Sequence, residues 1–553
     1  MIFGVKKNFI VIILAVLFFS MAFCAKAETL GENKKFFIEP SYDLLGRDNA
    51  DSVLVKISDK AYFYADQSWW NFTDRTEAIK SINALADEFS YKIYPVLVSF
   101  YGSEWNSGID NDSRITILIH PMSKESGGYF REKDEYSILQ NSFSNQREMI
   151  YLNSDYLKSD LEKSLLAHDF THLITFNQKN RIIGVKEDIW LNEGRADYSP
   201  TLLGYDSVYE GSNLQRRVRS FTEKPSESFI DWRNTKYSYA AVNLFIQYLV
   251  DNYGEDILVY SLKSNKSGID SINYALKKKG VKEDFSQIFL NWTIAVYLND
   301  CSASDKYCYK NPNLKNLQIS SQINFLPLSG ESTLSLADNL KNWTANWYKV
   351  IGGKETLKIK FQGDRAVFSK VPYIIKNRNG SYKVDFLTVG KDDTAEISVK
   401  NFGTDVIAFV IIPAVYKNNI LDGLYYSFFW SASIVKDENN SDLINQLLAQ
   451  IEYLKNEIAK LQGQNNGQNG GQNLSCASLN NNLYTGMKNS EVTCLQEFLK
   501  SQGAEVYPEG MVTGTFGQLT KNAVIRFQKK YLGAQYGTGF VGTLTRNKIN
   551  SMI

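Results

Sequence analysis

Two histidines stand four residues apart in a chain that contains only three. His168 and His172 belong to the segment LAHDFTHL, whose apolar residues recur at helical spacing. Residues i and i+4 share one face of a helix, so both imidazoles can reach one metal ion. Glu193 follows about twenty residues later, in IWLNEGRADY. Two histidines and one carboxylate, with a fourth position open, are the ligands of catalytic zinc. The sequence therefore predicts a Zn²⁺ site at His168, His172 and Glu193.

Helices are expected to position these ligands. Apolar spacing predicts one helix over 159–175 and another from about Leu191, which carries Glu193 and, one turn later, Asp197. The same patterns predict β-structure over 53–64, a helix over 75–91, a strand over 113–120 and an apolar helix over 239–253. The third histidine, His120, is expected to pack or hydrogen-bond at the end of its strand, and a role in substrate binding is the alternative.

These segments together resemble the gluzincin metallopeptidases, in which H-E-x-x-H precedes W-L-N-E-G-x-A-[ED]-Y by some twenty residues. The resemblance covers roughly residues 50–300. It includes SGGYF at 126–130, IYLN at 150–153 and YAAVNLFIQYLVDNYG at 239–254, as in exported bacterial members of that clan. It implies an α+β peptidase domain that hydrolyses peptide bonds and binds zinc through the three residues named above.

The resemblance also implies roles for residues around the metal. Asp197 would accept a ring N–H from a ligand histidine and fix its tautomer. Tyr239 stands where related enzymes place a phenol that stabilises the oxyanion, with Tyr237 as the alternative. The family's general base is Glu, but this chain has Asp169. A carboxylate remains, one methylene shorter, and a misplacement of ~1 Å can cost ~10²-fold in rate. Glu187 and Glu162 are the alternative bases.

The N-terminus predicts export. Residues 1–27 combine a charged start, an apolar run and Ala-Lys-Ala, as in a secretory signal peptide. An uncleaved membrane anchor and a lipoprotein attached through Cys24 are the alternatives.

The other four cysteines lie in two local pairs, which predict disulfides in an exported chain. The pairs are Cys301 with Cys308 and Cys476 with Cys494, and free buried cysteines are the alternative.

Downstream of the helices the hydrophobic period changes twice. Residues 320–435 contain short alternating segments that predict an all-β sandwich. Within 436–475, six apolar residues alternate at spacings of three and four, as in a short coiled coil or a lone spacer helix. GQNNGQNGGQN at 463–473 predicts a flexible linker.

The last 78 residues, 476–553, contain a repeated element. TGTFGQLT at 513–520 and TGFVGTLT at 538–545 each precede a predicted helix, with the final Thr as its expected N-cap. With LQEFL and AVIRFQ, this segment resembles the peptidoglycan-binding domain of bacterial wall enzymes. The resemblance implies a three-helix unit with peptidoglycan as its partner, and a helical cap without a ligand is the alternative.

The whole chain therefore reads as an α+β multidomain protein. Its predicted parts are a signal peptide (1–27), a gluzincin-like metallopeptidase domain (28–310), a β-sandwich (320–435), a coiled coil and linker (436–475) and a peptidoglycan-binding domain (476–553). The 61 Lys and Arg against 60 Asp and Glu, with no basic run, argue against nucleic acid as a partner.

Three functions are compatible with these features. The first is a secreted or envelope-associated zinc peptidase acting on a protein or peptide substrate, in contact with a membrane only if the signal segment stays uncleaved. The second is a wall-binding protein whose metallopeptidase fold has lost activity. A peptidoglycan amidase is a weaker third, because the His and Glu pattern matches peptidases.

Overall fold

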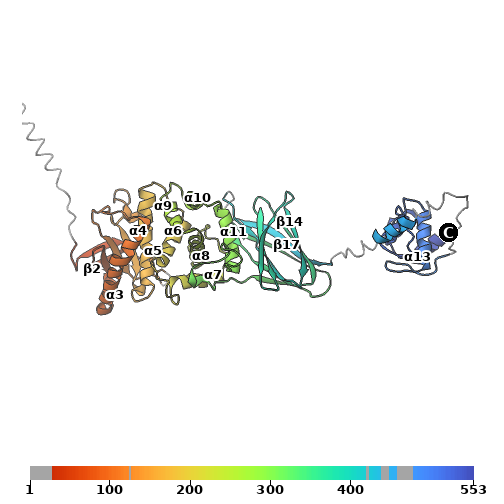
Figure 1. Ribbon diagram of the computed structural model, residues 1–553. Helices are drawn as coiled ribbons and strands as arrows, with labels where there is room; N and C mark the ends of the chain where they lie inside the picture. The colour runs from red at the N-terminus through yellow and green to blue at the C-terminus, as the bar shows by residue number, and fades with distance from the viewer. Residues whose placement is uncertain (1–27, 124–125, 419–422, 437–446, 457–477) are drawn as a thin grey trace, which may run out of the picture. The chain divides into compact units, whose positions relative to one another are not determined.

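The computed structural model describes residues 28–123, 126–418, 423–436, 447–456 and 478–553 (Figure 1). They divide into two compact units, residues 1–436 and 437–553. The predicted signal peptide, Cys24, Cys476 and most of the predicted coiled coil and linker lie outside the described residues, although residues 447–456 are helical. Among the helices in the described part of the chain, none has the length and apolar content needed to cross a membrane.

The first unit opens with a six-stranded sheet in the order β1-β2-β3-β4-β6-β5. Its strands are β1 (Asn33–Phe37), β2 (Asn49–Ile57), β3 (Ala61–Asp66), β4 (Ile115–His120), β5 (Gly128–Phe130) and β6 (Met149–Asn153). β3, β4 and β6 run parallel, whereas β5 pairs antiparallel with β6 at one edge. Both faces of β4 are buried, as expected for a parallel strand covered by helices.

Helices pack on this sheet and continue beyond it (Figure 1). They are α2 (Gln67–Trp70), α3 (Arg75–Glu88), α4 (Tyr94–Tyr101), α5 (Glu162–Thr175), α6 (Ile189–Leu202), α7 (Asn213–Glu223), α8 (Lys236–Tyr253), α9 (Asp256–Leu262), α10 (Gly268–Lys278) and α11 (Phe285–Leu298). α5 packs against β5 and β6 on one side and against α6 on the other, and α6 packs against α8. One apolar core runs through the sheet and these helices. The sheet edge at β5 and the helix pair α5–α6 are therefore neighbours.

A second sheet of nine strands lies between residues 322 and 435. Its strands are β7 (Gln322–Leu326), β8 (Ser332–Lys341), β10 (Tyr348–Gly352), β11 (Glu355–Gly363), β12 (Lys370–Asn377), β13 (Tyr382–Thr388), β14 (Thr394–Phe402), β15 (Val406–Ile411) and β17 (Tyr425–Val435). β14 and β15 join through the single pair Phe402 and Val406, and the sheet encloses its own apolar core.

This β-rich segment is joined to the helices by shared packing. Trp343 and Trp347 belong to the same apolar core as the helices. The Trp347 indole donates to the Thr293 carbonyl of α11 at 2.8 Å, and the Trp343 ring lies 5.0 Å from that of Phe285. The strands of 322–435 therefore stabilise the helical half of the unit directly.

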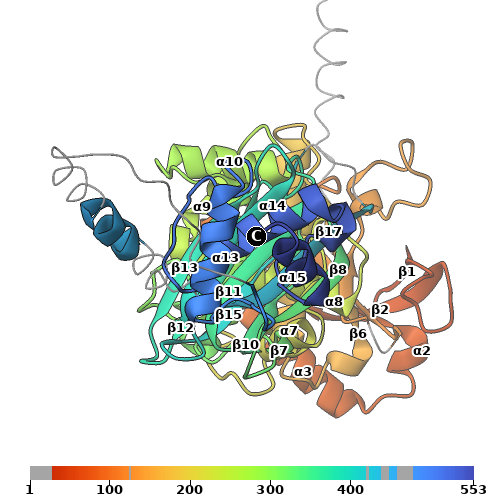
Figure 2. The ribbon, with the colours of Figure 1, turned by 90° about the vertical axis from the view of Figure 1, so that its right-hand side faces the viewer.

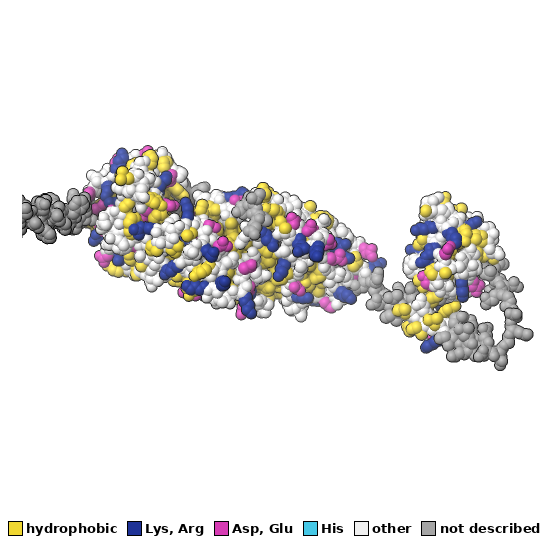
Figure 3. Space-filling model, turned by 90° about the horizontal axis from the view of Figure 1, so that it is seen from above, with side chains coloured by type: hydrophobic (Ala, Val, Ile, Leu, Met, Phe, Trp, Pro, Cys, Tyr) yellow, Lys and Arg dark blue, Asp and Glu magenta, His cyan; other side chains and the backbone are white. Residues whose placement is uncertain are grey.

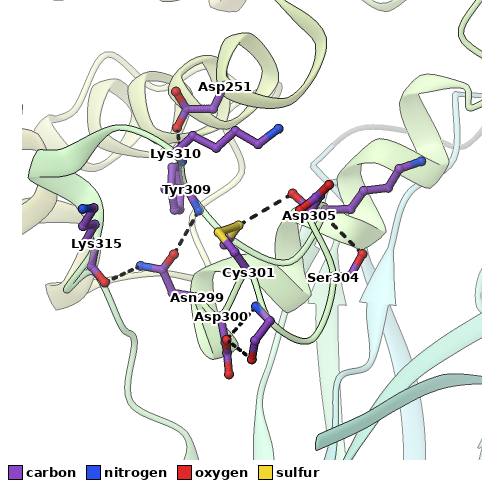
Figure 4. The surroundings of a disulfide bond; sticks show 12 residues. Asp251, Asn299, Asp300, Cys301, Ser304, Asp305, Tyr309, Lys310 and Lys315 are labelled. Carbon is purple, nitrogen blue, oxygen red and sulfur yellow. Dashed lines mark hydrogen bonds between the residues drawn. A yellow bond between two sulfur atoms is a disulfide. The ribbon is translucent and has the colours of Figure 1, made fainter.

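A disulfide closes the loop after α11 (Figure 4). Cys301 and Cys308 are bonded, with 5.1 Å between their Cα atoms, which confirms that predicted pair. Asn299 ends α11 in the left-handed region and accepts from the Tyr309 amide at 2.9 Å. Cys494 is also a disulfide cysteine, while its predicted partner lies outside the described residues.

The second unit is built around α13 (Ser490–Ser501), α14 (Gln518–Tyr531) and α15 (Thr543–Asn550) (Figure 2). It has an apolar core of its own. The prediction that Thr520 and Thr545 cap their helices is wrong, because Gly517 and Gly542 are the N-caps. Both threonines lie in the first helical turn and instead accept from buried glutamine amides.

Those two glutamines explain the repeated element. Gln496 accepts from the amides of Thr513 and Gly514 at 2.8 Å and donates to Thr520 at 2.8 Å. Gln528 accepts from the Gly539 amide at 2.8 Å and donates to Thr545 at 2.9 Å. Each Thr-Gly turn is thus held by one buried side chain, which satisfies backbone donors that would otherwise be orphaned.

Candidate metal centre

The two histidines of α5 face the same carboxylate of α6. Nε2 of His168 and Nε2 of His172 are 3.1 Å apart and lie 3.2 Å and 3.4 Å from Oε2 of Glu193. Within the described residues, these three side chains form a donor group whose atoms all lie within 4.8 Å of one another. The structure therefore brings together all three predicted ligands.

Close helix packing makes this convergence possible. A Cβ on Gly194, next to Glu193, would lie 2.8 Å from Ile246 and 3.0 Å from Val242 of α8. Glycine lets α6 approach α8 closely while the neighbouring glutamate points back to α5. The Glu-Gly dipeptide of the sequence motif thus serves both the ligand set and the packing behind it.

The electrostatics of the group suit a cation. Burial alone would raise the pKa of Glu193, but the adjacent His172 and His168 hold it at about 2. Burial would lower the pKa of His168, yet the neighbouring carboxylates of Asp197 and Glu193 raise it to about 10. Oε2 of Glu193 is buried and receives no well-aligned hydrogen bond. These donors fit a divalent cation, which would supply the positive charge that the carboxylates stabilise.

Asp197 lies behind His168, as the resemblance implied. Its Oδ1 is 3.4 Å from Nδ1 of His168, on the ring side opposite the donor atom that faces Glu193. Arg217 of α7 donates to both oxygens at 2.7 and 2.8 Å, and Asn213 donates to Oδ1 at 3.2 Å. Burial opposes ionisation, but Arg217 and His168 hold the pKa of Asp197 well below its usual range. The α7 partners lack a recognisable motif and were missed in the sequence.

Asp169 lies between the histidines and the edge strand. Its side chain is buried, and a Cβ on Gly128 of β5 would sit 2.2 Å from its Oδ2. Burial raises the pKa of Asp169 to about 6, and the neighbouring His168 and His172 limit that rise. The carboxylate thus stands beside the donor group, at the sheet edge.

The alternative bases lie in different surroundings. Glu187 accepts from Arg195 at 2.7 Å and from the Gly268 amide at 2.8 Å, inside a buried network. Glu162 lies in the first turn of α5, and burial raises its pKa to about 9. Of these three carboxylates, Asp169 is the one that is adjacent in sequence to His168 and packed against the edge strand.

Tyr239 lies beside the donor group, and Tyr237 does not. The Tyr239 ring centroid is 6.3 Å from that of His168, and its hydroxyl donates to Oδ1 of Asn234 at 3.1 Å. Asn234 has a φ of 54°, a left-handed conformation that asparagine adopts more readily than most residues with a side chain. Tyr237 instead lies under the ammonium groups of Lys224 and Lys236.

Tyr42 also lies near the donor group and was missed in the sequence. Burial raises its pKa, and Glu193 raises it further, whereas a hydrogen bond with Asn234 opposes the rise. Its ring stacks on Tyr129 of β5 at 4.7 Å. No periodic or motif signal marks this tyrosine, because it lies in the connection between β1 and β2.

His120 is structural, as predicted. It is fully buried at the end of β4, with Nδ1 3.4 Å from Oδ1 of Asp43 and Nε2 3.4 Å from the Tyr129 hydroxyl. Burial lowers its pKa to about 4. His120 thus forms a packed network with Asp43 and with Tyr129 of the edge strand β5.

Comparison with known proteins identifies the C-terminal unit. Residues 488–549 match the model of a peptidoglycan binding domain family. This unit is a peptidoglycan-binding domain. No curated protein matches the chain.

Three of the solved structures that match this chain are distantly similar to it. The pre-peptidase C-terminal domain of a Bacillus anthracis collagenase is 9% identical over 20% of this chain and 96% of that one, with a TM-score of 0.15. The Aeromonas hydrophila inhibitor of g-type lysozyme is 11% identical over 21% and 100%, also at 0.15. An M60 catalytic domain with two CBM51 domains from Clostridium perfringens is 9% identical over 70% and 60%, at 0.24. These similarities are too weak to assign a fold or function to this chain.

Proposed function

We propose that the chain is an exported zinc metallopeptidase of gluzincin type, held at the bacterial cell wall by its C-terminal domain. The observation that carries the catalytic part is the convergence of His168, His172 and Glu193 within 4.8 Å. The family match of residues 488–549 supports the attachment to the wall.

The surrounding residues have the chemistry that peptide hydrolysis requires. His168, His172 and Glu193 would hold the metal, which when bound polarises the scissile carbonyl. Asp197 would accept the Nδ1 proton of His168 and fix the ring. Asp169 would take the proton of the attacking water and deliver it to the leaving amine. The Tyr239 hydroxyl would donate to the oxyanion, leaving Asn234 when the substrate is bound.

The sheet edge offers a place for the substrate. β5 is the outermost strand on its side of the sheet and packs against α5. An extended peptide can add to such an edge as a further strand through backbone hydrogen bonds. A hollow lined by four aromatic residues opens beside it, together with the charged and polar side chains of Glu39, Arg131, Glu132, Lys133 and Asn141; the aromatic residues are Tyr42, Tyr129, Phe130 and Tyr136. An aromatic substrate side chain that also carries a polar group would fit this mixed lining.

A second candidate function is a wall-binding protein with an inactive peptidase fold. Asp169 favours it, because the shorter side chain withdraws the base from the donor group. Both functions predict metal binding, and only the peptidase predicts turnover.

The test measures metal and turnover separately. The mature chain should hold about one zinc per molecule by atomic emission, and His168→Ala should lose it. Tyr239→Phe should lower kcat on a peptide library by at least ~10-fold, whereas the matched control Tyr237→Phe should not. A protein that stays metal-free after zinc loading would overturn the assignment of the metal site and with it the peptidase, and a zinc-loaded protein without turnover leaves only the second function.

Wall attachment is tested with the two units. The full chain should sediment with purified sacculi, whereas a chain ending at residue 436 should stay in the supernatant. The truncated chain should keep its zinc, because the donor group lies in the first unit.

A further inference from the structure

We propose that Tyr484 and Phe540 form the surface through which the C-terminal unit binds the glycan strand of peptidoglycan, rather than its stem peptides. This inference rests on the proposed attachment to the wall and assigns the contact residues and the part of the polymer they recognise. It is carried by the backbone register, the exposure of the two rings and the polar groups beside them.

A short antiparallel bridge sets the direction of both rings. The amides and carbonyls of Leu483 and Val541 exchange two hydrogen bonds, of 3.1 and 2.9 Å. Leu483 and Val541 are fully buried in the core of the unit. Side chains alternate along an extended segment, and this register places residues 484 and 540 opposite each other. Tyr484 and Phe540 therefore share the outward face.

The two rings form one exposed aromatic surface. Tyr484 is 53% exposed and Phe540 43% exposed. Their centroids are 6.3 Å apart and their planes are inclined by only 26°. Isolated exposed aromatics are common, but an aligned pair on a small domain that binds a polymer points to a contact surface.

Phe540 is held in place before any ligand binds. Its carbonyl accepts from Gln528 at 2.8 Å, and its ring packs over Gly542, where a Cβ would lie 2.8 Å from it. Little conformational entropy is therefore lost on binding. In the first copy of the repeat, Thr515 occupies the equivalent position. The aromatic surface is thus specific to the second turn and is not required by the repeat itself.

Polar groups flank the rings. Asn482, two residues before Tyr484, bonds to Arg546 of α15, and Arg546 also donates to Thr543 at 3.4 Å. Sugar rings present apolar C–H faces that stack on aromatic rings, and hydroxyl and acetamido groups that pair with Asn and Arg. Stem peptides carry several charges and would call for a cluster of charged partners. The uncharged ring pair with a polar rim matches the glycan.

The experiment uses the full mature chain and three probes: intact sacculi, glycan strands freed of stem peptides by an amidase, and the released peptides. Wild type should bind sacculi and bare glycan strands, and the released peptides should not compete. Tyr484→Ala and Phe540→Thr should each weaken binding by at least ~10-fold. The latter installs the residue of the first turn, so the fold should be retained, and circular dichroism checks this. Thr515→Ala is the matched control and should bind like wild type.

The outcomes distinguish a failure of the proposed glycan contact from a failure of wall attachment. Wild-type binding that survives both substitutions, or competition by stem peptides with loss of binding to bare glycan, would overturn this inference and leave wall attachment intact. Failure of the wild type to bind sacculi would overturn the wall attachment itself.

Discussion

Gly128 and Asp169 are in contact where the edge strand β5 packs against helix α5. A Cβ on Gly128 would lie 2.2 Å from Oδ2 of Asp169. No side chain other than hydrogen fits there without moving the carboxylate. The glycine therefore lets β5 approach the proposed base, which would bring a peptide added to β5 close to the donor group.

Gly128→Ala tests this contact. The methyl group must displace Asp169, and it would also lie 2.7 Å from the backbone oxygen of Tyr151 on β6. We therefore expect kcat/KM on peptides to fall by at least ~10-fold, since ~1 Å errors in position can cost ~10²-fold. Zinc content should not change, because neither residue is a ligand. Gly517→Ala is the control, since its Cβ would meet no atom within 4 Å. Full activity of Gly128→Ala would show that the contact is not needed for turnover.

Substitutions at Asp169 test the base itself. Asp169→Ala should abolish turnover, because it removes the carboxylate that lies next to His168 and packs on β5. Asp169→Glu should retain or raise activity, since the added methylene restores the reach found in related enzymes. A ~10-fold gain would correspond to about 1.4 kcal/mol of barrier. Unchanged activity in Asp169→Ala would direct attention to Glu162.

The residues of the site whose positions depend on a local spacing in the sequence could be predicted. A histidine pair at i and i+4 on one helix fixes two donors, and the WLNEG motif placed the third on the next helix. Tyr239 needed the family resemblance, because its approach to His168 depends on how α8 packs. Arg217, Asn234 and Tyr42 reach the site from α7 and two loops, and tertiary contacts of this kind leave no periodic trace.

The same difference between local patterns and tertiary contacts applies to the fold. The helix over α5 and the strand β4 follow from apolar periodicity. The burial of Trp343 and Trp347 against α11 does not, because both residues lie in the connections between strands, where no hydrophobic period indicates which side chains are covered. The prediction that Thr520 and Thr545 are N-caps was wrong for a related reason. Their partners, Gln496 on α13 and Gln528 on α14, lie on the preceding helices.

Asp197→Asn tests the support of His168. Loss of the negative charge weakens the pull on the ring N–H and leaves the Arg217 guanidinium without its ionic partner. Zinc affinity should fall by about 10–100-fold, measured by competition with a chelator. Asp270→Asn, on the exposed face of α10, is the control. Equal affinities in both variants would remove Asp197 from the metal site.

A group of acidic side chains is buried inside the first unit. On the surface seen in Figure 3, by contrast, cationic and anionic side chains are mixed. Glu148 is 2% exposed and accepts from the Ile109 amide at 3.1 Å. The charges of Asp110 and Glu104 raise the pKa of Glu148, and the charge of Glu148 in turn raises the pKa of Glu135. Burial, and then the adjacent carboxylates, raise the pKa of Glu148 to about 7.

This shift predicts how stability depends on pH. Between its ordinary pKa of 4.5 and the folded value of about 7, Glu148 binds a proton in the folded state that it loses on unfolding. The free energy of unfolding should therefore fall as pH rises through this window. Glu148→Gln keeps the oxygen that accepts from Ile109 and removes the ionisation, so it should flatten the slope and stabilise the unit at pH 8.

All nine tryptophans lie before residue 436, so urea unfolding followed by tryptophan fluorescence at pH 5 and 8 reports on the first unit alone. Exposed Glu331→Gln is the control, and a Glu148→Gln profile parallel to wild type would contradict the prediction.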